Sequence, residues 1–152
     1  MIVANTTYQA APWADALFAM DLTWWQRYRS DVQSQFRGER YSTAPVGGSV
    51  KHLTAPFKGY GNSGAACIAL AAFGGASKVV MLGFDCQKTG GKAHWHGDHP
   101  KGLANAKQID KWHLRFEELA ADLEGVEALN ASRETALTMF RRVVLDDVLG
   151  AS

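Results

Sequence analysis

The stretch GYGNSGAACIALAAFGGASKVVMLGFD, residues 59–85, decides the fold class of this chain. Asn62 or Ser63 is an N-cap in front of an Ala-rich, uncharged segment that ends at a Gly-Gly pair, a pattern that predicts a helix. Because this helix has no charged face, we expect it to be covered on most sides. Residues 78–83 contain the apolar run VVML, which is typical of a strand in a parallel sheet with both faces covered. Together these features predict half of a doubly wound α/β unit.

The rest of the chain alternates short strand patterns with helical patterns. The predicted strands are residues 2–4, 16–20, 40–43, 49–54, 78–83 and 126–129. Besides the Ala-rich helix, helices are predicted from an N-cap at Thr23, over residues 108–123, and over residues 137–149. This alternation predicts one domain over residues 1–152 with a three-layer, Rossmann-like α/β fold, in which helices cover both faces of a mainly parallel sheet.

Composition excludes several classes of protein. The 152 residues include 16 Lys and Arg and 15 Asp and Glu, for a net charge of +1, and the basic residues are scattered. This pattern argues against a nucleic-acid-binding surface or binding to an anionic membrane. No apolar run approaches the ~20 residues that span a bilayer, and the N-terminus lacks a signal-peptide pattern. Cys67 and Cys86 form no CxxC pair, so we expect a reducing, cytoplasmic environment.

Polar side chains follow four of the predicted strands. They are Asn5, Asp21, Asp85, Asn130 and Ser132. In parallel sheets, ligands bind beyond the carboxyl ends of the strands, where these side chains would meet. Each residue alone is as well explained as a turn cap, since Asn and Asp favour turns. As a set, they predict a ligand crevice at this edge.

Asn62, Ser63 and Gly64 open the Ala-rich helix and are candidate contacts for a phosphate. A helix N-terminus offers unpaired N–H groups and the positive end of the helix dipole, and Gly64 permits close approach. The segment is not a P-loop, because the GxxxxGK[ST] pattern and its lysine are absent. Ordinary helix capping is the alternative interpretation.

The segment AHWHGDHP, residues 93–100, holds three histidines. His94 and His96 could transfer protons or stabilise a leaving phosphate, with Asp85 orienting the imidazole or the substrate. The indole of Trp95 suggests that this loop covers a base or a sugar. Zinc bound by His94, His96 and His99 is an alternative, although no familiar structural zinc spacing is present. A polar surface loop is a further alternative, and for the isolated His52 and His113 we expect structural roles.

Several of these motifs resemble one family. The opening IVANTTYQAAPWADALFAMD, the NSGAA motif at 62–66, the GFD motif at 83–85, HWHGDHP and the later LNAS are similar to phage and prophage proteins of the sialyltransferase-like class. That class is distantly related to bacterial sialyltransferases and to archaeal hydroxymethylpterin diphosphokinase-like domains. The resemblance extends from residue 2 to about residue 140. Its motifs are more specific for fold than for substrate.

The resemblance implies a nucleotide-dependent transferase of phage or prophage origin, acting on a glycosyl or phosphate-containing group without an obligatory cofactor or metal. It places Asn62, Ser63 and Gly64 near phosphate or ribose, and it makes Asp85, His94 and His96 candidates for acid–base or leaving-group roles. The remaining crevice residues would be Asn5, Asp21, Asn130 and Ser132. The ligand would be a nucleotide or a nucleotide sugar.

Relatives usually begin with an extra strand and a GxGPS-type loop, so the resemblance also implies an N-terminally shortened fold. This departure favours an alternative function. The chain could be a non-catalytic phage protein that keeps the fold, as a virion component or an inhibitor of a host system. Such a protein would bind a phage or host protein or assemble as a homo-oligomer, and it would be virion-associated rather than only cytoplasmic.

Overall fold

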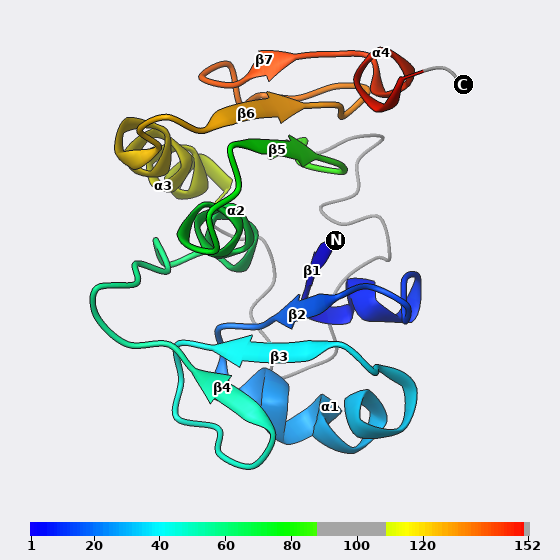
Figure 1. Cartoon of the computed structure of the whole chain (residues 1–152). Helices are drawn as coiled ribbons and strands as arrows, with labels where there is room; N and C mark the ends of the chain where they lie inside the picture. The colour runs from blue at the N-terminus through cyan, green and yellow to red at the C-terminus, as the bar shows by residue number, and fades with distance from the viewer. Residues whose placement is uncertain (88–108, 151–152) are drawn as a thin grey trace. The chain divides into compact units, whose positions relative to one another are not determined.

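The computed structural model describes residues 1–87 and 109–150 and divides the chain into two compact units, residues 1–73 and 74–152 (Figure 1). Each unit contains its own parallel sheet flanked by helices. This arrangement confirms the predicted Rossmann-like α/β class, with strands that are parallel throughout the described residues. The expectation of a single domain stays a prediction.

The first unit is built on a four-stranded sheet in which the strands follow chain order. They are β1 (Ile2–Ala4), β2 (Ala16–Phe18), β3 (Glu39–Ser42) and β4 (Val50–His52). A 3-10 helix, η1 (Asn5–Gln9), follows β1, and helix α1 (Leu22–Gln35) connects β2 to β3. The four predicted strands of this unit are therefore confirmed within a few residues of their expected bounds.

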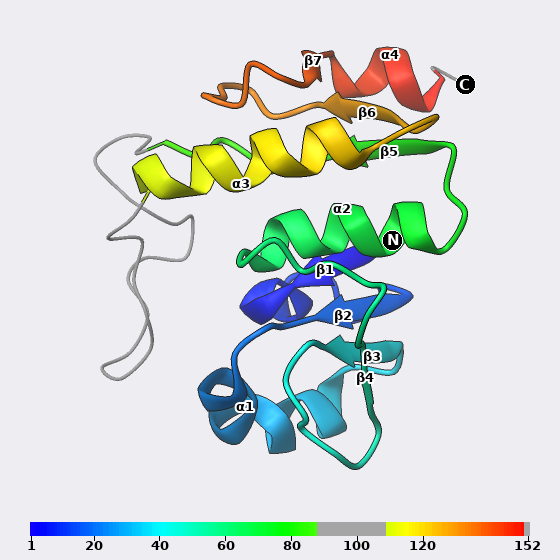
Figure 2. The ribbon, with the colours of Figure 1, turned by 90° about the vertical axis from the view of Figure 1, so that its left-hand side faces the viewer.

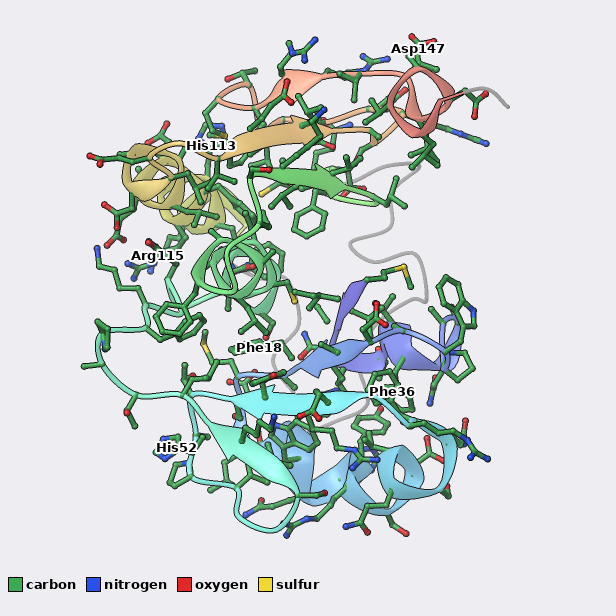
Figure 3. The ribbon with its side chains drawn as sticks, viewed as in Figure 1. Phe18, Phe36, His52, His113, Arg115 and Asp147 are labelled. Carbon is green, nitrogen blue, oxygen red and sulfur yellow. The ribbon has the colours of Figure 1, made fainter. Side chains whose placement is uncertain are left out.

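Helix α2 (Ser63–Phe73) contacts β1 and β2 and covers one face of this sheet (Figure 2). Its Ala66 and Cys67 pack against Phe18 of β2, which is labelled in Figure 3. The buried residues of α2 lie in its first half, whereas Phe73 at its end is 60% exposed. The expectation that α2 is covered on most sides therefore fails at Phe73, the last residue of the helix.

The opposite face of the same sheet is covered by η1 and α1. Side chains alternate along a strand, so Leu17 points away from Phe18, and both residues are fully buried. Tyr8 of η1 packs edge-on against Trp24 of α1 and donates a hydrogen bond to the Asp31 carboxylate. Burial, followed by this hydrogen bond, raises the pKa of Tyr8. The contact fixes η1 against α1.

The start of α1 differs from the prediction of an N-cap at Thr23. The helix begins at Leu22, with Asp21 in the N-cap position, and the Asp21 side chain makes no capping hydrogen bond. Trp24 and Trp25 are both buried, at 3% and 1% exposure, and the Trp25 indole donates to the Ala19 carbonyl oxygen at 3.0 Å. Neither indole is therefore exposed for a self-association surface.

The second unit contains a three-stranded sheet. Its strands are β5 (Lys78–Met81), β6 (Glu127–Asn130) and β7 (Arg141–Arg142), in that order. Helix α3 (Ile109–Asp122) confirms the predicted amphipathic helix, with Phe116 and Leu119 buried. Phe116 packs edge-on against Phe84 and Phe140.

Two predictions for this unit need correction. The helix expected over residues 137–149 is wrong in its first half, because Arg141 and Arg142 pair with β6 as β7 and only α4 (Leu145–Leu149) is helical. The strand expected over residues 78–83 stops at Met81, and Leu82 is 53% exposed. Because β5 stands at the end of the strand order of its sheet, it is less covered than a central strand.

Within residues 1–87 and 109–150, none of the helices combines the length and the hydropathy needed to span a bilayer.

Gly38 gives a direct test of how β2 and β3 pair. A Cβ atom at this position would lie 2.4 Å from the carbonyl oxygens of both Ala14 and Asp15. The Asp15 oxygen also accepts a 2.8 Å hydrogen bond from the Glu39 N–H, so this backbone has little room to move. We expect Gly38→Ala to lower the free energy of unfolding in urea by roughly 3 kcal/mol. At Gly47 a Cβ would meet no atom within 4 Å, so Gly47→Ala should cost only the penalty of its positive φ, about 1 kcal/mol. Equal losses would contradict the packing.

Candidate functional site

The carboxyl edge of the first sheet begins at Asn5, directly after β1. Its φ of 49° is left-handed, a conformation that non-glycine residues rarely adopt. Its side-chain oxygen is buried and has no hydrogen-bond partner among the described residues. Strained backbone and unpaired buried polar groups each cost free energy, and both tend to occur at functional sites. Among the described residues, Asn5 thus has an acceptor without a partner at the edge where a ligand is expected.

The N-termini of two helices meet at this same edge. The Ser63 hydroxyl oxygen, in the first turn of α2, accepts a 3.3 Å hydrogen bond from the backbone N–H of Met20. Met20 lies just past β2, and α1 begins two residues later at Leu22. Neither helix has an acidic residue in its first turn, although Asp21 occupies the N-cap position of α1. The positive ends of two helix dipoles therefore lie close together at the carboxyl end of β2.

Asn62 is the N-cap of α2, as predicted. Its side-chain oxygen accepts hydrogen bonds from the N–H groups of Gly64 at 2.8 Å and Ala65 at 3.0 Å. Capping therefore occupies two of the donors that a phosphate would otherwise use. Asn62 stabilises the start of the helix, and the helix dipole rather than those two donors remains available to an anion.

A lysine that the sequence analysis did not single out lies at this edge. A Cβ at Gly59 would be 3.0 Å from the Met20 Cε and 3.2 Å from the Thr43 Cγ2, so this loop packs against the residues that follow β2 and β3. The neighbouring Lys58 places its ammonium 5.4 Å from the ring centroid of Tyr60. Its sequence signal was KGYGNSG, with a lysine four residues before the N-cap.

In the second unit, Asn130 and Ser132 hold two loops together. The Asn130 amide donates to the Phe84 carbonyl oxygen at 2.9 Å and to the Thr135 hydroxyl at 3.0 Å. Its oxygen accepts from the Ser132 N–H at 3.0 Å, and the Ser132 hydroxyl accepts from the Phe84 N–H at 2.8 Å. Asn130 is fully buried. These polar groups, which the sequence predicts as ligand contacts, join the loop after β5 to the loop after β6.

Asp85 lies in the loop after β5, which this network holds. Its side chain is half-buried, and its carbonyl oxygen accepts a 2.8 Å hydrogen bond from the Ala136 N–H. The adjacent Cys86 has its thiol pKa raised to about 11 by burial and then by the Asp85 charge. The Cys86 thiol is therefore protonated at neutral pH, a state in which a thiol is a weak nucleophile.

The remaining candidates can be placed by unit. Asn5, Asp21, Asn62, Ser63 and Gly64 belong to the first unit, and Asp85, Asn130 and Ser132 belong to the second. One crevice lined by all of them stays a prediction. His94, His96 and His99 lie outside the described residues, so the zinc alternative also stays a prediction. Within residues 1–87 and 109–150, no group of three or more His, Cys, Asp or Glu side chains is arranged to hold a metal ion.

Comparison with models of protein families, with curated proteins and with solved structures found no match to this chain. The fold by itself defines the chain as a Rossmann-like α/β protein with parallel sheets, and its function must be inferred from the residues at the two sheet edges.

Asn130→Asp should separate a structural from a ligand-binding role. The change replaces the donating NH₂ with an acceptor that faces the Phe84 carbonyl oxygen, so we expect a loss of about 3 kcal/mol in the free energy of unfolding. Glu127→Gln, on the same strand, alters only exposed ion pairs and should have a much smaller effect. Denaturant titration measures both. If the two variants were equally stable, the network would not hold the loops.

Proposed function

We propose that the protein is a nucleotide-dependent transferase that binds the phosphate of a nucleotide or nucleotide sugar at the carboxyl edge of the β1–β4 sheet. The observation that carries this proposal is the meeting of two helix N-termini, tied by the Met20–Ser63 hydrogen bond. Two dipole ends favour an anion more strongly than one helix start alone, and Lys58 in the adjoining loop would add a positive charge. The resemblance to sialyltransferase-like proteins supports the same ligand class.

The polar residues of this edge suit the sugar of such a ligand. The unused Asn5 oxygen can accept a hydrogen bond from a ribose or sugar hydroxyl. Asp21 is exposed beside the start of α1. As a carboxylate it accepts hydrogen bonds from hydroxyl groups but repels phosphate. We assign Asn5 and Asp21 to hydroxyl recognition. Ser63 and Gly64 lie nearer the phosphate, and Asn62 acts through the helix that it caps.

In the proposed transfer, the bond between the transferred group and the nucleotide phosphate breaks, and the phosphate leaves with the electron pair. An acceptor hydroxyl forms the new bond and loses its proton. We assign proton transfer, or stabilisation of the leaving phosphate, to His94 or His96, with Asp85 orienting the imidazole or the substrate. No metal is required for this sequence of steps. His96→Ala should abolish transfer and leave the fold intact.

The first experiment is a thermal-shift panel of CMP, UDP, ADP and GDP, their sugar conjugates and zinc, applied to the full chain. A nucleotide at ~100 times its Kd should stabilise the fold by about 2.7 kcal/mol, enough to raise Tm visibly. We expect one nucleotide class to raise Tm. A shift with zinc alone would replace this proposal with the zinc alternative on the histidine loop.

Lys58→Gln tests whether the binding edge is the one described. Removal of one charge that faces a phosphate should weaken binding of the nucleotide found in the panel by roughly ten- to hundredfold, because charge-assisted hydrogen bonds are worth about 1.5–3 kcal/mol. Lys51→Gln is the matched control, because Lys51 is an exposed lysine of β4 that pairs with Glu39. Calorimetric titration measures both affinities. Equal affinities would place the nucleotide elsewhere.

The second candidate function is a non-catalytic protein that retains the fold, binding a phage or host protein or a second copy of itself. It is favoured by the polar groups of Asn130 and Ser132, which are used in internal hydrogen bonds rather than left for a ligand. No response to any member of the panel, together with a stable dimer or larger assembly in light scattering, would support it over the transferase.

A further inference from the structure

We infer that His113 is a positioning residue for Asp85, and that it acts through the backbone of Ala136. The inference rests on the proposed role of Asp85 for its effect on the reaction. The structural part concerns hydrogen bonds within the second unit alone. It can therefore be tested whether or not the transferase proposal holds.

The imidazole of His113 bridges α3 and the loop after β6. Its Nε2 lies 3.0 Å from the carbonyl oxygen of Ala136, which can only accept, so Nε2 donates this hydrogen bond. Its Nδ1 lies 3.1 Å from the Glu117 carboxylate, one turn further along α3. Figure 3 shows His113 on this helix, together with Arg115. When both ring nitrogens carry a proton, the Glu117 carboxylate accepts from Nδ1 and orients the ring whose Nε2 holds the loop.

The same peptide segment that His113 holds also holds Asp85. The Ala136 N–H donates to the Asp85 carbonyl oxygen at 2.8 Å, and the Thr135 hydroxyl donates to the Phe84 carbonyl oxygen at 2.7 Å. Two consecutive residues of the loop after β6 therefore fix two consecutive residues of the loop after β5. A displacement of Ala136 would be passed to Asp85 through one hydrogen bond.

His113 contacts this segment from helix α3. Thr135 is also bound by the Asn130 amide, from the end of β6, at 3.0 Å. Asn130 anchors the segment at one side and His113 anchors it at the other. Without the imidazole, the Ala136 N–H keeps its hydrogen bond to the Asp85 carbonyl oxygen. The Ala136 carbonyl oxygen loses its hydrogen bond from His113 of α3. We therefore expect local loosening of the Asp85 loop rather than unfolding.

The test is amide hydrogen exchange by NMR on the full chain, with His113→Leu and His113→Gln. Loss of one hydrogen bond should accelerate exchange of the Ala136 amide on the order of fivefold in His113→Leu. The Gln side chain can still donate to the Ala136 carbonyl oxygen and should restore much of the protection. The Ala131 amide, bonded to the Met81 carbonyl oxygen in the same sheet, should exchange at the wild-type rate in both variants.

Arg115→Gln is the matched control on α3, because Arg115 pairs only with Glu118 across the exposed surface among the contacts described. It should leave Ala136 exchange unchanged. If His113→Leu does not fold, the shorter polar His113→Asn removes the same contact. Unchanged Ala136 exchange, or equal acceleration of the Ala131 and Ala136 amides, would overturn the inference.

Turnover gives the second readout. With a nucleotide sugar that the thermal-shift panel shows to bind, His113→Leu should lower kcat and leave KM unchanged, because the proposed phosphate contacts belong to the first unit. His113→Gln should recover kcat. Ala136 amide exchange can respond as expected while no member of the panel is turned over. In that case the proposed function fails, and the hydrogen bonds from His113 to Ala136 and from Ala136 to Asp85 are still supported. If kcat is unchanged in His113→Leu while Ala136 exchange accelerates, Asp85 does not depend on His113 for its proposed role.

Discussion

The first unit depends on the burial of one strand from both sides. Leu17 and Phe18 are neighbours on β2, point to opposite faces of the sheet and are both fully buried. A strand of this kind is stable only if each face has a cover, which explains why α2 packs on one side and η1 with α1 on the other. The buried Tyr8 and Trp24 complete the second cover.

The same constraint places polar groups at the edge of the sheet. A strand buried on both faces leaves no room for polar side chains along its length, so they gather where the strands end and the helices begin. Asn5 follows β1 in this way, and Ser63 reaches Met20 from the start of α2. The proposed binding edge is therefore a consequence of the layered packing, and the helix dipoles supply its positive potential.

The two units use similar residues in different ways. In the first unit, the Asn5 oxygen has no partner among the described residues and can serve a ligand. In the second, Asn130 is equally polar and fully buried, but each of its amide atoms is hydrogen-bonded to a loop. An asparagine at the end of a strand can thus either remain available to a ligand or hold a loop by hydrogen bonds. Which one occurs depends on whether a neighbouring loop closes over the side chain.

The sequence by itself determined the α/β class, six of the strand positions and a helix cap at Asn62 or Ser63, because each depends on residues close together in the chain. It failed for residues 141–142, whose pairing with β6 is a contact between distant segments that overrides local helical preference. Only the tertiary structure showed that the Asn130 amide is hydrogen-bonded while the Asn5 oxygen has no partner among the described residues, and only it packed the loop of Gly59, next to Lys58, against Met20 and Thr43. Hydrogen-bond partners and electrostatic neighbours depend on distances in space, and these are set by packing rather than by residue type.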